Sequence, residues 1–180
     1  MKANWITVAP ASDDTSLYIF KKSFNSKKPV ESFALRVSAD TRYRLFINGK
    51  ELAHGPCQST EYVKYYEELE CADCIQEGEN EISIAVLHVS LKAGTSFTTA
   101  FHREKPALYF DGALVSGDET IKIVSDESFL VFRAKHISFA HRFHNMASLP
   151  PFETVVGDEE YEELRCEVLY TPHIEDNCYG

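Results

Sequence analysis

The sequence predicts an all-β fold, an antiparallel β-sandwich made of two sheets. Apolar and polar side chains alternate in short segments that recur roughly every ten residues, a pattern typical of half-buried strands. Glycine, asparagine and aspartate separate these segments and favour tight turns. No stretch has a sustained 3.6-residue apolar period, so the alternating helices of a parallel α/β sheet are not expected.

The first strands are expected at residues 17–24 and 32–39. The first segment alternates around Tyr18, Phe20 and Phe24. In the second, the apolar side chains occupy every second position and therefore share the face that points into the core: Phe33, Leu35, Val37 and Ala39.

A β-hairpin is expected at residues 43–56. Tyr43, Leu45 and Ile47 alternate up to Asn48-Gly49, and a second extended run follows. Both turn residues tolerate positive φ, so they favour a two-residue type I′ turn whose twist matches the strands.

The rest of the chain predicts more strands, one short helical turn and two loops. A helical turn is expected at residues 71–76, and residues 81–90 read as a strand buried on both faces. Residues 92–105 and 136–163 read as loops, the second with an acidic run at its end. The further strands are expected at residues 63–69, 81–90, 107–115, 120–124, 129–135 and 166–170.

Composition excludes several classes of partner. The net charge of −10 and the lack of a basic stripe argue against nucleic acid and against an anionic membrane. No apolar run approaches the roughly 20 residues of a membrane span. Localisation stays open: cytoplasmic if residue 1 is the native start, secreted or periplasmic if a signal was removed. The five cysteines are expected to be reduced thiols, because they form no disulfide framework.

The order of several short motifs resembles the N-terminal β-sandwich domain of bacterial α-L-rhamnosidases and related glycoside hydrolases. The likeness covers roughly residues 5–135 and depends on the order and spacing of the motifs together. The motifs are Trp5-Ile6, Phe20-Lys21-Lys22-Ser23-Phe24, Tyr43-Arg44-Leu45-Phe46-Ile47-Asn48-Gly49, Gly55-Pro56, Gly78-Glu79-Asn80 and Ser125-Asp126-Glu127-Ser128-Phe129. In the last motif Phe129 stands where the family has tryptophan.

The resemblance implies a jelly roll of the galactose-binding-domain-like kind, with a loop-rich C-terminal segment. Residues 1–135 would form the β-sandwich accessory domain, and residues 136–180 a loop-rich continuation or arm of the same domain. In such enzymes the catalytic carboxylates lie in a following (α/α) barrel. The implied partner is thus the catalytic domain of the same polypeptide, and no cofactor is implied.

Reactive groups in this chain are expected to be structural. Glu67-Glu68 and the acidic run at 158–163 supply carboxyls, but adjacent strand residues point to opposite faces and acidic runs are usually solvated. Cys71 and Cys74 lack the second pair of ligands that a structural zinc would need. A transition metal on His136, His141 and His144 is the weaker alternative to a polar packing segment. No catalytic set and no metal site are therefore predicted.

Sugar binding is the main chemical option for this chain. Carbohydrate sites combine an aromatic platform with a few polar groups. Three tyrosines could form the platform and two residues of the long loop could donate hydrogen bonds: Tyr62, Tyr65, Tyr66, His102 and Arg103. Three hypotheses follow: a non-catalytic accessory domain of a larger hydrolase, an independent carbohydrate-binding module that takes a rhamnose-containing glycan, and a small metal-dependent enzyme.

Overall fold

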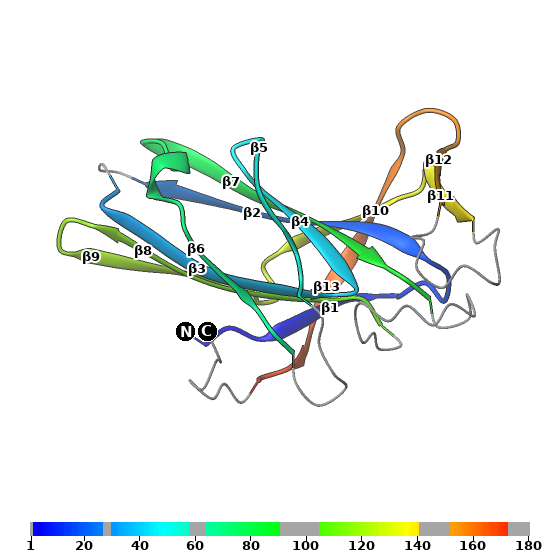
Figure 1. The fold of residues 1–180 in the computed structure, drawn as a ribbon, viewed down its shortest axis with the longest axis horizontal. Helices are drawn as coiled ribbons and strands as arrows, with labels where there is room; N and C mark the ends of the chain where they lie inside the picture. Colours follow the sequence, from blue (N-terminus) through cyan, green and yellow to red (C-terminus); the bar gives the residue numbers. More distant parts are fainter. Residues whose placement is uncertain (1, 27–29, 58–63, 91–104, 141–151, 173–180) are drawn as a thin grey trace.

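The fold consists of two antiparallel sheets that pack face to face (Figure 1). The computed structural model describes residues 2–26, 30–57, 64–90, 105–140 and 152–172. Every pairing between its strands is antiparallel, which confirms the all-β sandwich predicted from the sequence.

The two sheets meet at one shared strand. Sheet 1 contains, in order, β5 (Lys50–Gly55), β4 (Arg42–Ile47), β7 (Gly78–His88), β2 (Ser16–Ser26), β10 (Leu130–Ala134) and the first part of β13 (Tyr161–Tyr170). Sheet 2 contains the rest of β13, then β1 (Trp5–Ala9), β8 (Ala107–Ser116), β3 (Ser32–Asp40) and β6 (Glu67–Glu70), with β9 (Glu119–Val124) beside β8. A separate ribbon is formed by β11 (Ile137–Ala140) and β12 (Phe152–Val155).

Strand β13 joins the sheets because its two halves pair with different neighbours. Tyr161 to Leu164 pair with β10, and the strand then pairs with β1 from Arg165 onward. In Figure 1 this strand runs from the side of sheet 1 down to β1. One edge of the sandwich is thereby closed through continuous hydrogen bonding, and β5, β6 and β9 are edge strands with one neighbour each.

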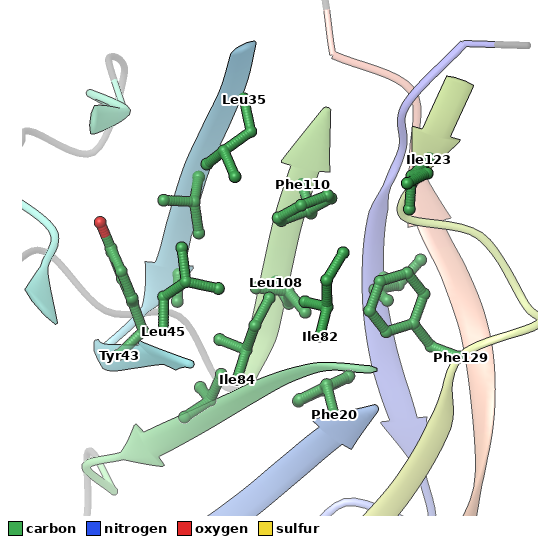
Figure 2. Packing of buried hydrophobic residues seen from close by; sticks show 14 of the residues in the cluster. Phe20, Leu35, Tyr43, Leu45, Ile82, Ile84, Leu108, Phe110, Ile123 and Phe129 are labelled. Atoms are coloured by element: carbon green, nitrogen blue, oxygen red, sulfur yellow. The ribbon is translucent and has the colours of Figure 1, made fainter. Parts of the chain in front are cut away.

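The core lies between the sheets and is built from the alternating positions. Phe33, Leu35 and Val37 of β3 are each at most 1% exposed and face sheet 1. Phe20, Ile82 and Ile84 of sheet 1 are equally buried and face them. Figure 2 shows these side chains packed with Leu35, Leu108 and Phe110 of sheet 2. The face predicted for residues 33–39 is confirmed.

The predicted hairpin is also confirmed. Asn48 has φ 51° and Gly49 has φ 77°, the positive pair that a type I′ turn requires. A short 3₁₀ helix, η1 (Ala72–Cys74), occupies the place of the expected helical turn.

Three sequence predictions differ from the structure. Residues 137–140 and 152–155 form strands, and β13 begins at Tyr161, so the predicted loop at 136–163 is wrong in those parts. Ion pairs explain the start of β13: Arg133 of β10 pairs with Glu162 of β13, and Lys135 pairs with Glu160 just beyond the two strands. β7 alternates between buried and half-buried positions up to His88, so it is not buried on both faces. The strand expected at 63–69 begins at Glu67, and position 63 lies outside the described residues.

In the described part of the chain no helix is long and apolar enough to span a membrane.

Candidate functional site

The motifs that carry the family resemblance contact one another inside the scaffold. Asn48 Nδ2 donates to Asn80 Oδ1 over 2.8 Å and to the carbonyl of Cys74 over 2.9 Å. The buried Asn80 in turn donates to the carbonyls of Gln76 and Gly78. The Asn-Gly and Gly-Glu-Asn motifs therefore form one hydrogen-bonded unit at the hairpin end of sheet 1.

A second pair of motifs meets across strands β2 and β10. Lys22 Nζ lies 3.4 Å from Asp126 Oδ1 and 5.6 Å from the centre of the Phe129 ring. Asp126 also accepts a hydrogen bond from the backbone N–H of Ser128, over 3.0 Å. Desolvation raises the pKa of Asp126, but the hydrogen bonds from Ser128 and the positive charge of Lys22 outweigh it and leave the pKa lowered. These motif residues stabilise turns and strand contacts.

The sequence-predicted sugar-binding residues are only partly within the described structure. Tyr62, His102 and Arg103 lie outside the described residues. Tyr65 and Tyr66 lie directly before β6, beside the outer face of sheet 2. The Ser38 hydroxyl donates to the carbonyl of Tyr65 over 2.6 Å, which fixes the tyrosine pair against β3.

The outer face of sheet 2 carries a row of charged side chains. Strand register places Glu68, Arg36 and Asp111 next to one another on β6, β3 and β8. Arg36 Nη2 lies 3.6 Å from Glu68 Oε1, and the guanidinium lies 5.1 Å from the centre of the Tyr66 ring. The row thus combines one cation, two carboxylates and an aromatic ring on a half-exposed surface.

An aromatic row lies beside it on the same face. Register places Tyr109, Trp5 and Tyr170 side by side on β8, β1 and β13. The ring centre of Trp5 lies 5.8 Å from that of Tyr109 and 6.1 Å from that of Tyr170. Together with Ala3, Ala107 and Val124 they form a second apolar cluster, separate from the main core.

The hydroxyl of Tyr109 is the unusual group at this surface. Tyr109 is 3% exposed, and its buried hydroxyl lies beside the Asp111 carboxylate. Burial and the neighbouring Asp111 carboxylate, through its charge and a hydrogen bond, together raise the pKa of Tyr109 to about 12. Arg36 and Tyr66 also act on this hydroxyl, so it lies among the side chains of the charged row.

We define the outer-face site as Arg36, Tyr66, Tyr109 and Asp111. Sequence reasoning found Tyr66 alone. Arg36, Tyr109 and Asp111 stand in predicted strands far apart in the chain, and only the register of β3 with β8 brings them together. Their alternation onto the outer face was the one available signal.

A buried polar cluster closes the corner between β3 and β4. Asp40 Oδ2 lies 3.3 Å from Lys64 Nζ, and Asp40 Oδ1 lies 4.0 Å from His88 Nδ1. The Thr41 hydroxyl accepts a hydrogen bond from the backbone N–H of Val89 over 3.1 Å. These contacts tie the end of β7 to the connection between the sheets, which indicates a structural role.

The remaining candidate reactive groups are engaged in packing. Glu67 accepts hydrogen bonds from the Tyr43 hydroxyl and from the backbone N–H of Cys57, each over 2.7 Å. Cys71 is buried, and desolvation raises the pKa of its thiol to about 12, which opposes nucleophilic chemistry. Within the described ranges, no three His, Cys, Asp or Glu side chains are grouped to hold a metal ion. His136 contacts the backbone of Glu160, while His141 and His144 lie outside those ranges.

Comparison with known proteins gives structural neighbours only. No family profile and no curated protein matches the sequence. A rhamnosidase of the GH78 family from Bacillus sp. GL1 matches with a TM-score of 0.72 and 19% identity, over 95% of this chain and 18% of that one. The α-L-rhamnosidase from Dictyoglumus thermophilum matches with a TM-score of 0.67 and 20% identity, over 94% and 21%. The chain shares its fold with part of each rhamnosidase.

This fold likeness confirms the resemblance that the motifs indicated. The chain spans about a fifth of the length of these rhamnosidases. A lectin from Pleurotus ostreatus, solved both free and with GalNAc, is a more distant neighbour. It matches with a TM-score of 0.54 and 16% identity, over 97% of this chain and 43% of the lectin.

Proposed function

We propose that this chain is a non-catalytic accessory domain of an α-L-rhamnosidase-like glycoside hydrolase and packs on a catalytic (α/α) barrel. The observation that carries the proposal is the partial coverage of the rhamnosidases. The chain has the fold of a domain-sized part, 18–21%, of each of these enzymes. The candidate carboxylates support it too, because Glu67 and Glu68 are held in structural contacts.

An exposed apolar flank supports docking on another domain. Of the six large apolar side chains exposed in the described part, five come from β10, the end of β12 and β13: Leu130, Val155, Val156, Tyr161 and Val168. Leu130 is 56% exposed and Val155 is 66% exposed. Exposed apolar side chains on these elements are available for a contact with a partner.

The test compares the same substitutions in two contexts. Leu130→Glu and Val155→Glu should change the free energy of unfolding of the isolated chain by less than about 0.5 kcal/mol, because both side chains are exposed. In the full-length hydrolase they should lower the melting temperature, since a charge would be buried against the barrel. Tyr65→Glu, at a 43% exposed position away from this flank, is the control. Equal effects in both contexts would reject docking through this flank.

A second candidate is an independent carbohydrate-binding module. The outer-face site favours it, because an aromatic ring beside an arginine and a carboxylate is a common composition for binding sugars. The lectin neighbour shares the fold, which supports the candidate at that level alone. Titration calorimetry of the chain with L-rhamnose tests it, and no heat at millimolar sugar would reject it for that ligand.

A further inference from the structure

Two cysteines lie one turn apart in the connection between the sheets. Cys71 directly precedes the short helix η1 and Cys74 is its last residue, between β6 of sheet 2 and β7 of sheet 1. The backbone N–H of Cys74 donates to the carbonyl of Cys71 over 3.0 Å. A turn closed by such a bond keeps the Cα atoms of its ends within about 7 Å, and side chains three residues apart in a 3₁₀ helix eclipse one another. This geometry suits a disulfide, which joins Cα atoms roughly 4.4–6.8 Å apart.

The two free thiols have different surroundings. Cys71 is buried, its Sγ donates to the carbonyl of Phe33 over 3.4 Å, and desolvation raises the pKa of its thiol, which keeps it protonated. The charge of Cys74 adds to that raised pKa, so the two sulfurs lie near each other. Cys74 is half-buried, and its Sγ accepts a hydrogen bond from the exposed Lys50 ammonium over 3.9 Å. A reagent from solvent therefore reaches Cys74 first.

We propose that Cys71 and Cys74 form a reversible disulfide, with a small-molecule disulfide such as oxidised glutathione as the oxidant. Cys74 loses its proton, and its sulfur attacks one glutathione sulfur and releases the other as a thiolate. The Cys71 thiol then gives up its proton, and its sulfur attacks Cys74 Sγ and releases the second glutathione. The two protons end on the two glutathione thiolates, so two protein thiols are oxidised while one glutathione disulfide is reduced.

This bond would lock a turn that contacts both sheets. The carbonyl of Cys74 accepts a hydrogen bond from Asn48 Nδ2 over 2.9 Å, in the hairpin of sheet 1. The backbone N–H of Cys71 donates to the carbonyl of Phe33 over 3.1 Å, in β3 of sheet 2. Since the native fold already holds the ends of the crosslink together, folding should favour the disulfide. The inference goes beyond both candidate functions and depends on neither.

The test is thiol–disulfide equilibrium of the 180-residue chain in glutathione redox buffers. Cleavage after lysine and arginine gives a peptide of residues 65–92, which contains Cys71 and Cys74 and no other cysteine. By mass spectrometry this peptide should lose two hydrogen atoms as oxidised glutathione rises, and regain them with dithiothreitol. The equilibrium constant for disulfide formation should be roughly tenfold larger for the folded chain than in concentrated urea.

Serine variants test the order of the two attacks. Cys71→Ser should keep glutathione on Cys74, because no second thiol displaces it, and Cys74→Ser should leave the buried Cys71 unmodified. Cys57→Ser, which removes an exposed thiol outside the turn, is the matched control and should leave the disulfide unchanged. The native chain decides the proposal even if a variant fails to fold. A native peptide that stays a dithiol or stops at the mixed disulfide would overturn it, as would an equilibrium constant no larger than in urea.

Discussion

At the scale of single residues, Asn48 shows why a turn residue can be a family marker. It adopts φ 51° in the hairpin and uses both ends of its amide. The Nδ2 atom donates to Cys74 and Asn80, and Oδ1 accepts from the backbone N–H of Glu81 over 3.0 Å. Its conformation and its contacts together select asparagine, because few other residues tolerate positive φ and also supply a donor and an acceptor.

Asn48→Ala should therefore destabilise the chain by about 2 kcal/mol, from the strained backbone and the lost hydrogen bonds. Urea unfolding at neutral pH measures this change. Asn48→Gly keeps the positive φ and loses only the side-chain contacts, so its stability should fall between alanine and the native residue. If Asn48→Ala and the native chain had the same free energy of unfolding within error, Asn48 would not stabilise the turn.

At the scale of elements, the open edge between β5 and β6 is held by a clasp, defined here as Tyr43, Gly55, Cys57 and Glu67. Glu67 extends from β6 of sheet 2 and bonds to Tyr43 of sheet 1 and to the backbone after β5. A Cβ atom on Gly55 would lie 2.9 Å from the Glu67 carboxylate oxygens. The glycine of the Gly-Pro motif thus makes room for the side chain that joins the two sheets.

Gly55→Ala should cost about 1–3 kcal/mol, because the added methyl group displaces the Glu67 carboxylate from its two partners. The control is the same substitution in a Glu67→Ala background, where the clash is gone. Denaturant unfolding of the four proteins gives the coupling between the two positions. If Gly55→Ala lowered the free energy of unfolding equally in both backgrounds, the Glu67 carboxylate would not be the reason that glycine is required at position 55.

The elements also show what the sequence could predict. Period-2 alternation predicted β2, β3, β4, β7 and β8 because each has one buried face. It failed for the start of β13, where acidic side chains are stabilised by Arg133 of β10 and by Lys135 just beyond that strand. The outer-face site was largely missed for a related reason: register between distant strands brings Arg36 and Asp111 together, and alternation alone does not give register.

At the scale of the whole molecule, the motif residues belong to the scaffold and the candidate functional residues lie on the surface. The motifs that resemble rhamnosidases lie in turns and strand contacts, and the fold matches part of those enzymes at 18–20% identity. The surfaces left for function are the apolar flank of β10, β12 and β13 and the outer face of sheet 2. Both suit a domain that works beside another domain.

The mass of the native polypeptide shows whether this chain is one domain of a larger protein. An antibody raised against the chain, used on an immunoblot of the source cells, reports the size of the protein that contains it. We expect a band at roughly five times 20.4 kDa, because the chain spans 18–21% of the matched rhamnosidases. A band at 20.4 kDa itself would show that the chain exists alone and would contradict the accessory role.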